Sequence, residues 1–189
     1  MLYLASQSPR RRELLTAEGY EFTVVVPDET AEDGRRSGEE PAAFVQRLAV
    51  QKARNAAEKV PGGTIIACDT VAVCGNEILG KPVDRNDAER MLRMLSGQRH
   101  FVFSGLCVLE AGITDSRSLK VGVATTELVM QPLAEEQLKA YLGSNLWQGK
   151  AGAFGYQDGN DWLRIVKGSE SNVVGLPLEL LKIALSEVH

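Results

Sequence analysis

The sequence lacks any long apolar run. None of its hydrophobic segments approaches the roughly 20 residues that a helix needs to cross a bilayer. Its first residues, Met1 to Ala5, include no basic region and are too short for a signal peptide. We therefore expect a cytoplasmic protein that has no membrane partner.

Cysteine and histidine are scarce. Cys68, Cys74 and Cys107 are odd in number and lie in apolar, strand-like runs, which favours small buried side chains in a reducing compartment. His100 and His189 are the only histidines, so cysteine and histidine together cannot supply a zinc site.

A surplus of positive charge is also missing. The formal net charge is −4 and the isoelectric point is near 5.3, so the chain has no general attraction for a nucleic-acid polymer or an anionic membrane. Any phosphate group must be held by a local cluster of cations, which favours a small-molecule ligand.

Short apolar strands alternate with helical segments along the chain. Length and composition fit one large domain or two small lobes that share a core. Strand–helix units in the first half and long strands in the second predict an α/β fold with a mixed, twisted central sheet flanked by helices. The pattern predicts strands at 2–5, 22–26, 64–73, 101–110, 119–129 and 162–166, a hairpin turn at 75–76, and helices at 9–18, 41–59, 84–95, 134–142 and from 177.

Three consecutive arginines, Arg10, Arg11 and Arg12, lie where a helix disfavours them. Ser8 fits the N-cap and Pro9 the first helical position, which puts Arg11 where a capping box would have Glu. A helix start is already positive, so carboxylates are favoured there and cations are not. The pattern indicates that an anion, of which phosphate is the obvious candidate, occupies this helix start.

Arg11 and Arg12 differ in the direction that the helix gives them. Leu14 and Leu15 lie three and four positions after Arg11, on the same face, so Arg11 is expected to point toward the body of the protein. Arg12 is followed by Glu13, and for it the alternative of a solvated charge is stronger.

Asp69 interrupts a nearly continuous apolar strand. Aspartate is disfavoured in strands, and an unpaired buried carboxylate is costly. Two structural interpretations are a strand-end cap and a buried ion pair. The functional interpretation is a carboxylate at the ligand-facing end of a central strand, where it holds a divalent cation or accepts a proton.

Two lysines extend the set of candidate cations. Lys52 falls inside the apolar stripe of the predicted helix at 41–59, so it either snorkels to solvent or projects inward toward an anion. Lys81 precedes Pro82, which imposes an extended backbone on it. Together with Arg11 these lysines would suit a triphosphate.

Glu29 and Gln157 are weaker candidates. Glu29 follows the second predicted strand, where most acids are simply solvated. Gln157 lies in a glycine-rich turn and has both a donor and an acceptor for the edge of a base, although a plain turn amide fits equally well. The segment from Gly143 to Lys150 is not a P-loop, because its glycines are one position too far apart and Ala151 replaces Ser or Thr.

Seven blocks of the chain resemble, in order, the motifs of the Maf family. They cover essentially the whole length: Leu4-Ala5-Ser6-Gln7-Ser8-Pro9-Arg10-Arg11, Leu48-Ala49 with Lys52-Ala53, Asp69-Thr70, Gly80-Lys81-Pro82, Leu95-Ser96-Gly97, Lys150-Ala151-Gly152-Ala153-Phe154-Gly155 and Val173-Val174-Gly175-Leu176-Pro177-Leu178.

The resemblance implies a single Maf-like domain over residues 1–189, with two lobes around a central cleft and a fold similar to that of inosine triphosphate pyrophosphatases. It also implies a homodimer that hydrolyses a nucleoside triphosphate to the monophosphate and pyrophosphate with a divalent cation, Mg²⁺ or Mn²⁺. A nucleotide-binding regulator of septum formation with incidental hydrolysis is the alternative.

Carried over by motif, the resemblance makes Asp69 the general base, close to the metal. Glu29 becomes a further metal carboxylate. The phosphates would be held by four residues: Ser6, Arg11, Lys52 and Lys81.

Three further positions separate the branches of the family. Here they hold Arg10, Thr70 and Gln157, a set that resembles the branch acting on dTTP and UTP. The branch acting on 7-methyl-GTP has Trp, Gln and Glu there, so a modified nucleotide is the alternative substrate.

Overall fold

The computed structural model describes residues 1–28, 30, 33–113 and 118–187. The chain divides into two compact units. The first comprises Met1–Asp69, Ser104–Ala124 and Gly175–His189, and the second comprises Thr70–Phe103 and Thr125–Val174. Two lobes around a central cleft remain a prediction.

A mixed seven-stranded sheet runs through the chain, as predicted. The strand order is β2-β1-β3-β5-β6-β7, and β4 pairs with β3. β1 is parallel to β2 and β3, whereas β4 is antiparallel to β3 and β7 is antiparallel to β6. The strands are β1 Leu2–Ala5, β2 Thr23–Val24, β3 Gly63–Cys74, β4 Glu77–Leu79, β5 Arg99–Ala111, β6 Leu119–Met130 and β7 Leu163–Lys167.

Helices follow the predicted pattern with small changes at their ends. They are α1 Pro9–Ala17, α2 Pro41–Ala57, α3 Arg85–Leu95, α4 Glu135–Gly143, α5 Glu170–Val174 and α6 Leu178–Ser186. The pattern did not predict α5 or the short 3-10 helices η3 (Ala151–Ala153) and η4 (Tyr156–Asp158), which are too short to show a period. Within the described part of the chain, no helix combines the length and apolarity needed to span a bilayer.

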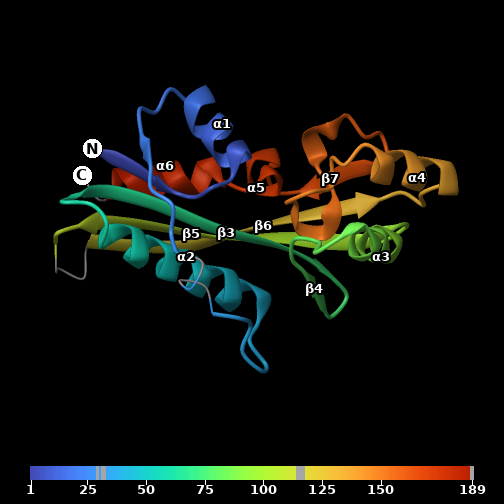
Figure 1. The fold of residues 1–189 in the computed structure, drawn as a ribbon, viewed down its shortest axis with the longest axis horizontal. Helices are drawn as coiled ribbons and strands as arrows, with labels where there is room; N and C mark the ends of the chain where they lie inside the picture. The colour runs from blue at the N-terminus through green and yellow to red at the C-terminus, as the bar shows by residue number, and fades with distance from the viewer. Residues whose placement is uncertain (29, 31–32, 114–117, 188–189) are drawn as a thin grey trace. The chain divides into compact units, whose positions relative to one another are not determined.

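The first unit has three layers. In Figure 1, α2 covers one face of the sheet, and α1 and α6 cover the other. Side chains alternate between these faces because successive residues of a strand point in opposite directions. Tyr3, Ala5, Ile65 and Ala67 pack with the α2 alanines, whereas Leu4, Ile66 and Cys68 pack with Leu15 of α1 and Leu181 of α6.

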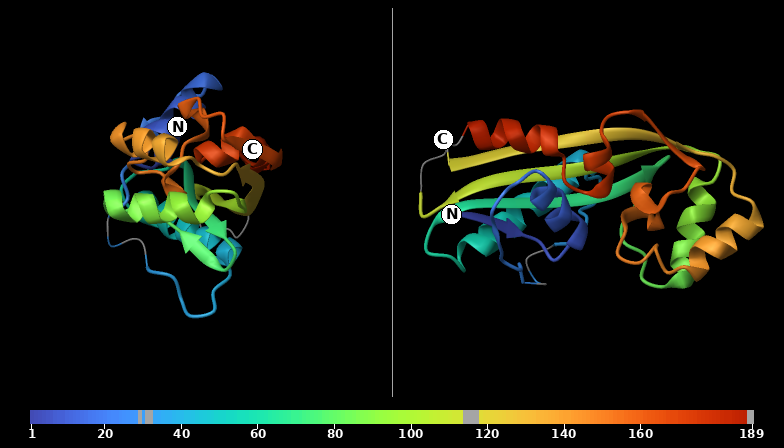
Figure 2. Two further views of the ribbon diagram at one scale, coloured as in Figure 1. Left: turned by 90° about the vertical axis from the view of Figure 1, so that its right-hand side faces the viewer. Right: turned by 90° about the horizontal axis from the view of Figure 1, so that it is seen from above.

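Two glycines allow helices to approach the sheet of this unit closely. A Cβ at Gly105 of β5 would lie 2.6 Å from the backbone nitrogen of Gln46 and closer still to the carbonyl of Val45, both on α2. On the other face, α6 lies alongside β6 in the right-hand view of Figure 2, where a Cβ at Gly122 would lie 3.0 Å from the Leu180 methyls. Both helices therefore pack directly against the strand backbone at these glycines.

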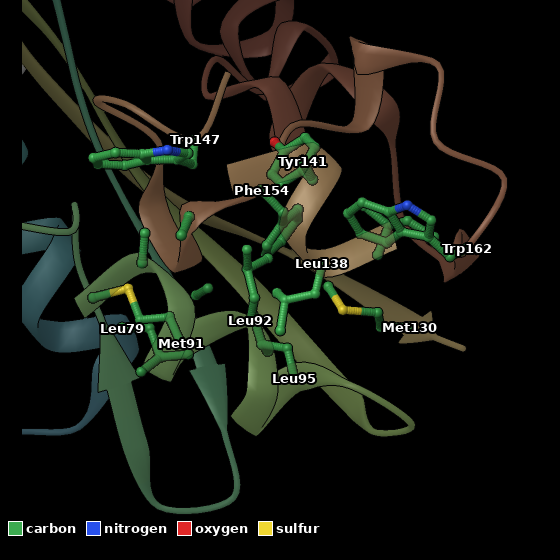
Figure 3. Close-up of a cluster of buried hydrophobic side chains, with 14 of the residues drawn as sticks. Leu79, Met91, Leu92, Leu95, Met130, Leu138, Tyr141, Trp147, Phe154 and Trp162 are labelled. Atoms are coloured by element: carbon green, nitrogen blue, oxygen red, sulfur yellow. The ribbon is translucent and has the colours of Figure 1, made fainter. Parts of the chain in front are cut away.

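The second unit is built around an apolar cluster of α3, α4 and neighbouring strands (Figure 3). Asp84 caps α3 by accepting a hydrogen bond from the Asp87 N–H at 2.8 Å. The labelled members of the cluster are Leu79, Met91, Leu92, Leu95, Met130, Leu138, Tyr141, Trp147, Phe154 and Trp162. Such a contiguous aromatic and aliphatic cluster is the main source of stability for a unit of this size.

Candidate active site

Ser6 and Arg11 meet where β1 ends and α1 begins. The Ser6 hydroxyl accepts hydrogen bonds from the Ser8 N–H at 3.1 Å and from Arg11 Nη1 at 3.2 Å. Arg11 is half-buried and Arg12 is exposed, so the predicted inward direction of Arg11 is confirmed. Ser8 takes the N-cap position but makes no side-chain cap bond, and the first turn contains no acid. This helix start therefore keeps its positive potential.

A backbone carbonyl links Arg11 to the strand that carries Asp69. Arg11 Nε donates to the Gly175 carbonyl at 2.7 Å, and the Cys68 thiol contacts the same carbonyl at 3.2 Å. Gly175 follows the end of α5 and has a φ of +122°. Three segments distant in sequence thus converge beside Asp69, all within the first unit.

Lys52 and Asp69 form a buried ion pair. Lys52 Nζ lies 2.5 Å from Asp69 Oδ1, and the two residues are 7% and 9% exposed. The inward projection of Lys52 is confirmed, and the snorkelling alternative is wrong. The ion pair considered for Asp69 is also present, while its role with water or metal stays a prediction. Either charge alone would be strongly destabilising at this depth, and in the pair each charge compensates the other.

Asp69 does not lie at the end of its strand, which corrects the sequence-based placement and excludes a strand-end cap. β3 continues to Cys74 because β4 pairs with it, Ala72 opposite Leu79. The parallel pairing with β1, however, ends at Ala5 opposite Ala67. Asp69 lies two residues beyond that point, so it follows the carboxyl end of β1, where ligands of open α/β sheets bind.

The segment before Glu29 is tied to the C-terminal half of α2. The Asp28 N–H donates to Asn55 Oδ1 at 2.9 Å, and Asn55 Nδ2 donates to Asp28 Oδ2 at 3.0 Å. Lys59 Nζ donates to Asp28 Oδ1 at 2.7 Å. The hydrogen bonds from Lys59 and Asn55 lower the pKa of Asp28. Glu29 itself lies outside the described residues, and its role stays a prediction.

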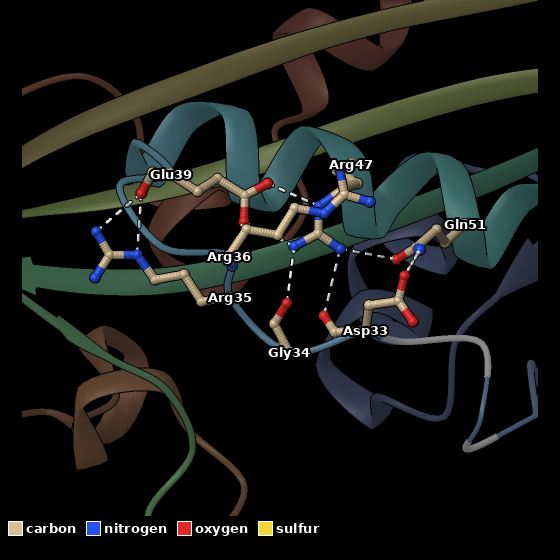
Figure 4. Close-up of polar contacts among 7 residues, drawn as sticks. All are labelled: Asp33, Gly34, Arg35, Arg36, Glu39, Arg47 and Gln51. Atoms are coloured by element: carbon tan, nitrogen blue, oxygen red, sulfur yellow. Dashed lines mark hydrogen bonds and ion pairs between the residues drawn. The ribbon is translucent and has the colours of Figure 1, made fainter.

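Residues after Glu29 are tied to the middle of the same helix (Figure 4). Arg47 binds both carboxylate oxygens of Glu39 at 2.7 Å and the Gly34 carbonyl at 3.0 Å. This hydrogen bonding from Arg47 lowers the pKa of Glu39 to about 2. Gln51 Nε2 donates to Asp33 at 2.7 Å. The helix that carries Lys52 therefore anchors the loop on both sides of Glu29.

The remaining predicted residues have different locations. Arg10 is half-buried in the first turn of α1, in the first unit. Thr70 directly follows Asp69 on β3, Lys81 is exposed after β4, and Gln157 is exposed in η4. These three belong to the second unit, and the approach of Lys81 and Gln157 to Asp69 stays a prediction.

Sequence reasoning missed a buried polar cluster in the second unit. Lys150 forms an ion pair with both oxygens of Asp158, and the Tyr141 hydroxyl donates to Asp158 at 2.7 Å. Lys150 opens the Lys150–Gly155 block of the family resemblance, but neither that block nor the P-loop comparison indicates a buried partner for it.

The described residues contain no group of three or more His, Cys, Asp or Glu side chains placed to hold a metal ion. Mg²⁺ is usually bound by one or two carboxylates together with substrate phosphates and water. Asp69, an oxygen donor beside Arg11 and Lys52, fits that kind of site.

Two solved structures resemble parts of the chain. The Ham1 protein of Staphylococcus aureus matches with a TM-score of 0.44 and 17% identity, over 68% of this chain and 71% of that one. The nucleoside-triphosphatase / dITP/XTP pyrophosphatase of Mycobacterium abscessus matches with a TM-score of 0.40 and 15% identity, over 70% of this chain and 74% of that one.

Sequence relatives are much more similar. A protein of Rhodopirellula baltica named dTTP/UTP pyrophosphatase is 50% identical over 95% of this chain and 78% of its own length. Proteins of the same name from Vibrio cholerae and Geobacter sulfurreducens are 44% and 42% identical, each over 94% of this chain and 92% and 91% of their own lengths. The family model described as Maf-like protein matches residues 1–188. The chain therefore belongs to the Maf family.

Proposed function

We propose that this protein is a nucleoside triphosphate pyrophosphatase that hydrolyses dTTP and UTP to the monophosphate and pyrophosphate. The observation that carries the proposal is the buried pair of Lys52 and Asp69, beside the Arg11–Ser6 pair at the carboxyl end of β1. The naming of similar proteins as dTTP/UTP pyrophosphatases supports it. On this proposal the protein clears these nucleotides from the pool as a cytoplasmic homodimer.

The triphosphate is the part of the substrate that the first unit is equipped to bind. Arg11 offers a planar guanidinium at the positive start of α1, and Ser6 lies within hydrogen-bond distance of it. Lys52 supplies an ammonium group held by α2. Lys81 is proposed as a third cation, acting on the charge of the leaving pyrophosphate.

Asp69 is proposed as the general base. Its carboxylate takes a proton from a water molecule, whose oxygen forms a bond to the α-phosphorus. The bond from that phosphorus to the bridging oxygen breaks, and the electron pair leaves with pyrophosphate. Arg11 and Lys52 stabilise the charge that develops, and no covalent intermediate is required.

In the proposed site, Asp69 and Glu29 would hold a divalent cation, Mg²⁺ or Mn²⁺. The cation would neutralise part of the charge of the phosphates.

Arg10, Thr70 and Gln157 are proposed to set the preference for pyrimidines. The Gln157 amide has one acceptor and two donors, which complement the N3–H and O4 of uracil and thymine. Because that edge is the same in both bases, one protein can act on UTP and dTTP.

Measuring pyrophosphate release from dTTP, UTP, CTP and 7-methyl-GTP, with Mg²⁺ and with Mn²⁺, tests the proposal. We expect release from dTTP and UTP, and none when the cation is chelated. Saturable nucleotide binding without product would favour the regulator instead, and preferential release from 7-methyl-GTP would overturn the substrate assignment.

A further inference from the structure

The buried cluster of Tyr141, Lys150 and Asp158 has no part in the chemistry proposed for Asp69. All three belong to the second unit. Tyr141 and Lys150 are each 7% exposed, and the Asp158 side chain is 6% exposed. An ion pair this deeply buried requires compensation of both charges, so its presence in a loop calls for a physical reason.

The cluster holds one short turn, residues 155–159, from several sides. The Gly155 N–H donates to the Tyr141 hydroxyl at 3.1 Å, and that hydroxyl donates to Asp158 at 2.7 Å. The Gly155 carbonyl accepts from Asn160 Nδ2 at 3.2 Å. Lys150 Nζ donates to both carboxylate oxygens of Asp158. Gly155 and Asp158 are thus both held by the Tyr141 hydroxyl, and Asp158 is also held by Lys150.

The support for this turn reaches into the apolar core of the unit. Tyr141 lies on α4 and packs edge-on against Trp162, with ring centroids 5.5 Å apart and an interplanar angle of 84°. Both aromatic rings belong to the cluster in Figure 3. The position of Asp158 is therefore set by the packed core and not by the loop alone.

Gln157 is exposed in this turn, and the other exposed residue, Gly159, has no side chain. Gln157 lies directly before Asp158 in η4, and Gly159 ends the turn in the left-handed region with a φ of +75°. Asp158 accepts three hydrogen bonds from Lys150 and Tyr141, so the backbone of the neighbouring Gln157 is held in place. Fixing a contact residue before binding reduces the entropy lost on binding and sharpens discrimination between ligands.

We infer that Tyr141, Lys150 and Asp158 are positioning residues that hold Gln157 for recognition of the pyrimidine edge. This inference rests on the proposed function. The chemical distinction concerned is between uracil, with N3–H and O4, and cytosine, whose N3 accepts and whose N4 donates. A flexible Gln157 amide can turn to hydrogen-bond with either base. An amide held in one orientation favours the donor and acceptor arrangement of one base.

Two substitutions loosen the turn without leaving a buried charge unpaired. Tyr141→Phe removes the hydroxyl that joins Gly155 to Asp158. Gly155→Ala is compatible with its backbone, which has a φ of −125°, but the new Cβ would overlap Lys150 Nζ and Asp158 Oδ2. Gly143→Ala is the matched control, because a Cβ there meets no atom within 4 Å and alanine is favoured in a helix.

The readout is the ratio of kcat/KM for UTP to kcat/KM for CTP. We expect Tyr141→Phe and Gly155→Ala to lower this ratio about tenfold, the value of one well-made hydrogen bond, with KM for UTP rising and kcat nearly unchanged. The Gly143→Ala ratio should equal that of the unmodified protein. Equal losses on UTP and CTP, or a ratio unchanged in both variants, would show that the cluster only stabilises the fold.

The unmodified protein separates this inference from the proposed function. If it releases pyrophosphate from neither dTTP nor UTP, both are wrong. If it does release pyrophosphate and the variants keep its UTP/CTP ratio, only the positioning role is overturned.

Discussion

Lys52 of α2 and Asp69 of β3 are joined by a buried ion pair, with 2.5 Å between Nζ and Oδ1. The pair connects a helix on one face of the sheet to the strand beside β1. Neither charge is stable alone at this depth, so each residue fixes the position of the other. This arrangement presents one cation and one carboxylate at a single point.

Asp69→Asn should reduce turnover by about two to four orders of magnitude, because an amide cannot take the proton of the attacking water. The amide oxygen can still accept from Lys52, so we expect the variant to fold with reduced stability. Circular dichroism and steady-state kinetics measure the two effects. Asp161→Asn, at an exposed carboxylate, is the control, and near-normal turnover of Asp69→Asn would remove the residue from its role.

Arg11→Lys should raise KM for the triphosphate about tenfold or more. A lysine cannot reproduce the planar guanidinium that contacts both Ser6 and Gly175. Arg12→Ala removes an exposed charge from the same turn, and we expect it to change KM by only about twofold. Equal effects of the two substitutions would refute a specific role for Arg11.

A sequence pattern could predict the direction of a side chain within one helix or strand, but not its partner on another element. Arg11 and Lys52 could be assigned directions because helical spacing relates them to Leu15 and to the α2 stripe. The partner of Lys52 could not be named, since Asp69 is 17 residues away on another element and no period connects them. The hairpin turn at 75–76 was predicted, and β4 pairs with β3 there, but no pattern related Asp69 to the carboxyl end of β1.

The same limit explains what was missed elsewhere. Lys150 and Asp158 lie in irregular segments with no hydrophobic period, so the sequence gives no indication that their side chains are buried. The five residues of α5 are too few for a helical pattern. Long apolar strands and capped helices were predicted well because their signals are local and repeated.

Gly105→Ala should destabilise the protein by about 1–3 kcal/mol, because the added methyl would meet the backbone of α2 and not a flexible side chain. The displaced helix also carries Lys52, so kcat should fall as well. Chemical denaturation measures the stability. Gly34→Ala is the matched control, since a Cβ there meets nothing within 4 Å, and equal stability of the two variants would contradict the close packing.

His100 should make the free energy of unfolding depend on pH. Its side chain is fully buried, with its ring edge-on to Phe154 at 5.1 Å, and neither ring nitrogen makes a well-formed hydrogen bond with the described residues. Burial lowers the pKa of His100 to about 4 from a usual 6.5. The unfolded chain therefore binds more protons between these values, so the stability contributed is complete above pH 6.5 and is lost as pH falls toward 4.

A comparison with His100→Leu isolates this effect, because the carboxylates titrate in both proteins. From pH 7 to pH 5 the unmodified protein should lose about 2 kcal/mol more unfolding free energy than the variant. Denaturant titrations at the two pH values measure the difference. Parallel losses would mean that His100 is not held neutral by burial.

Hydrolysis of UTP in ¹⁸O-labelled water tests the central claim most directly, because it reports which phosphorus the water attacks. If water activated at Asp69 attacks the α-phosphorus, mass spectrometry will find the label in UMP and none in pyrophosphate. Label in pyrophosphate, or formation of UDP and labelled orthophosphate, would contradict the account.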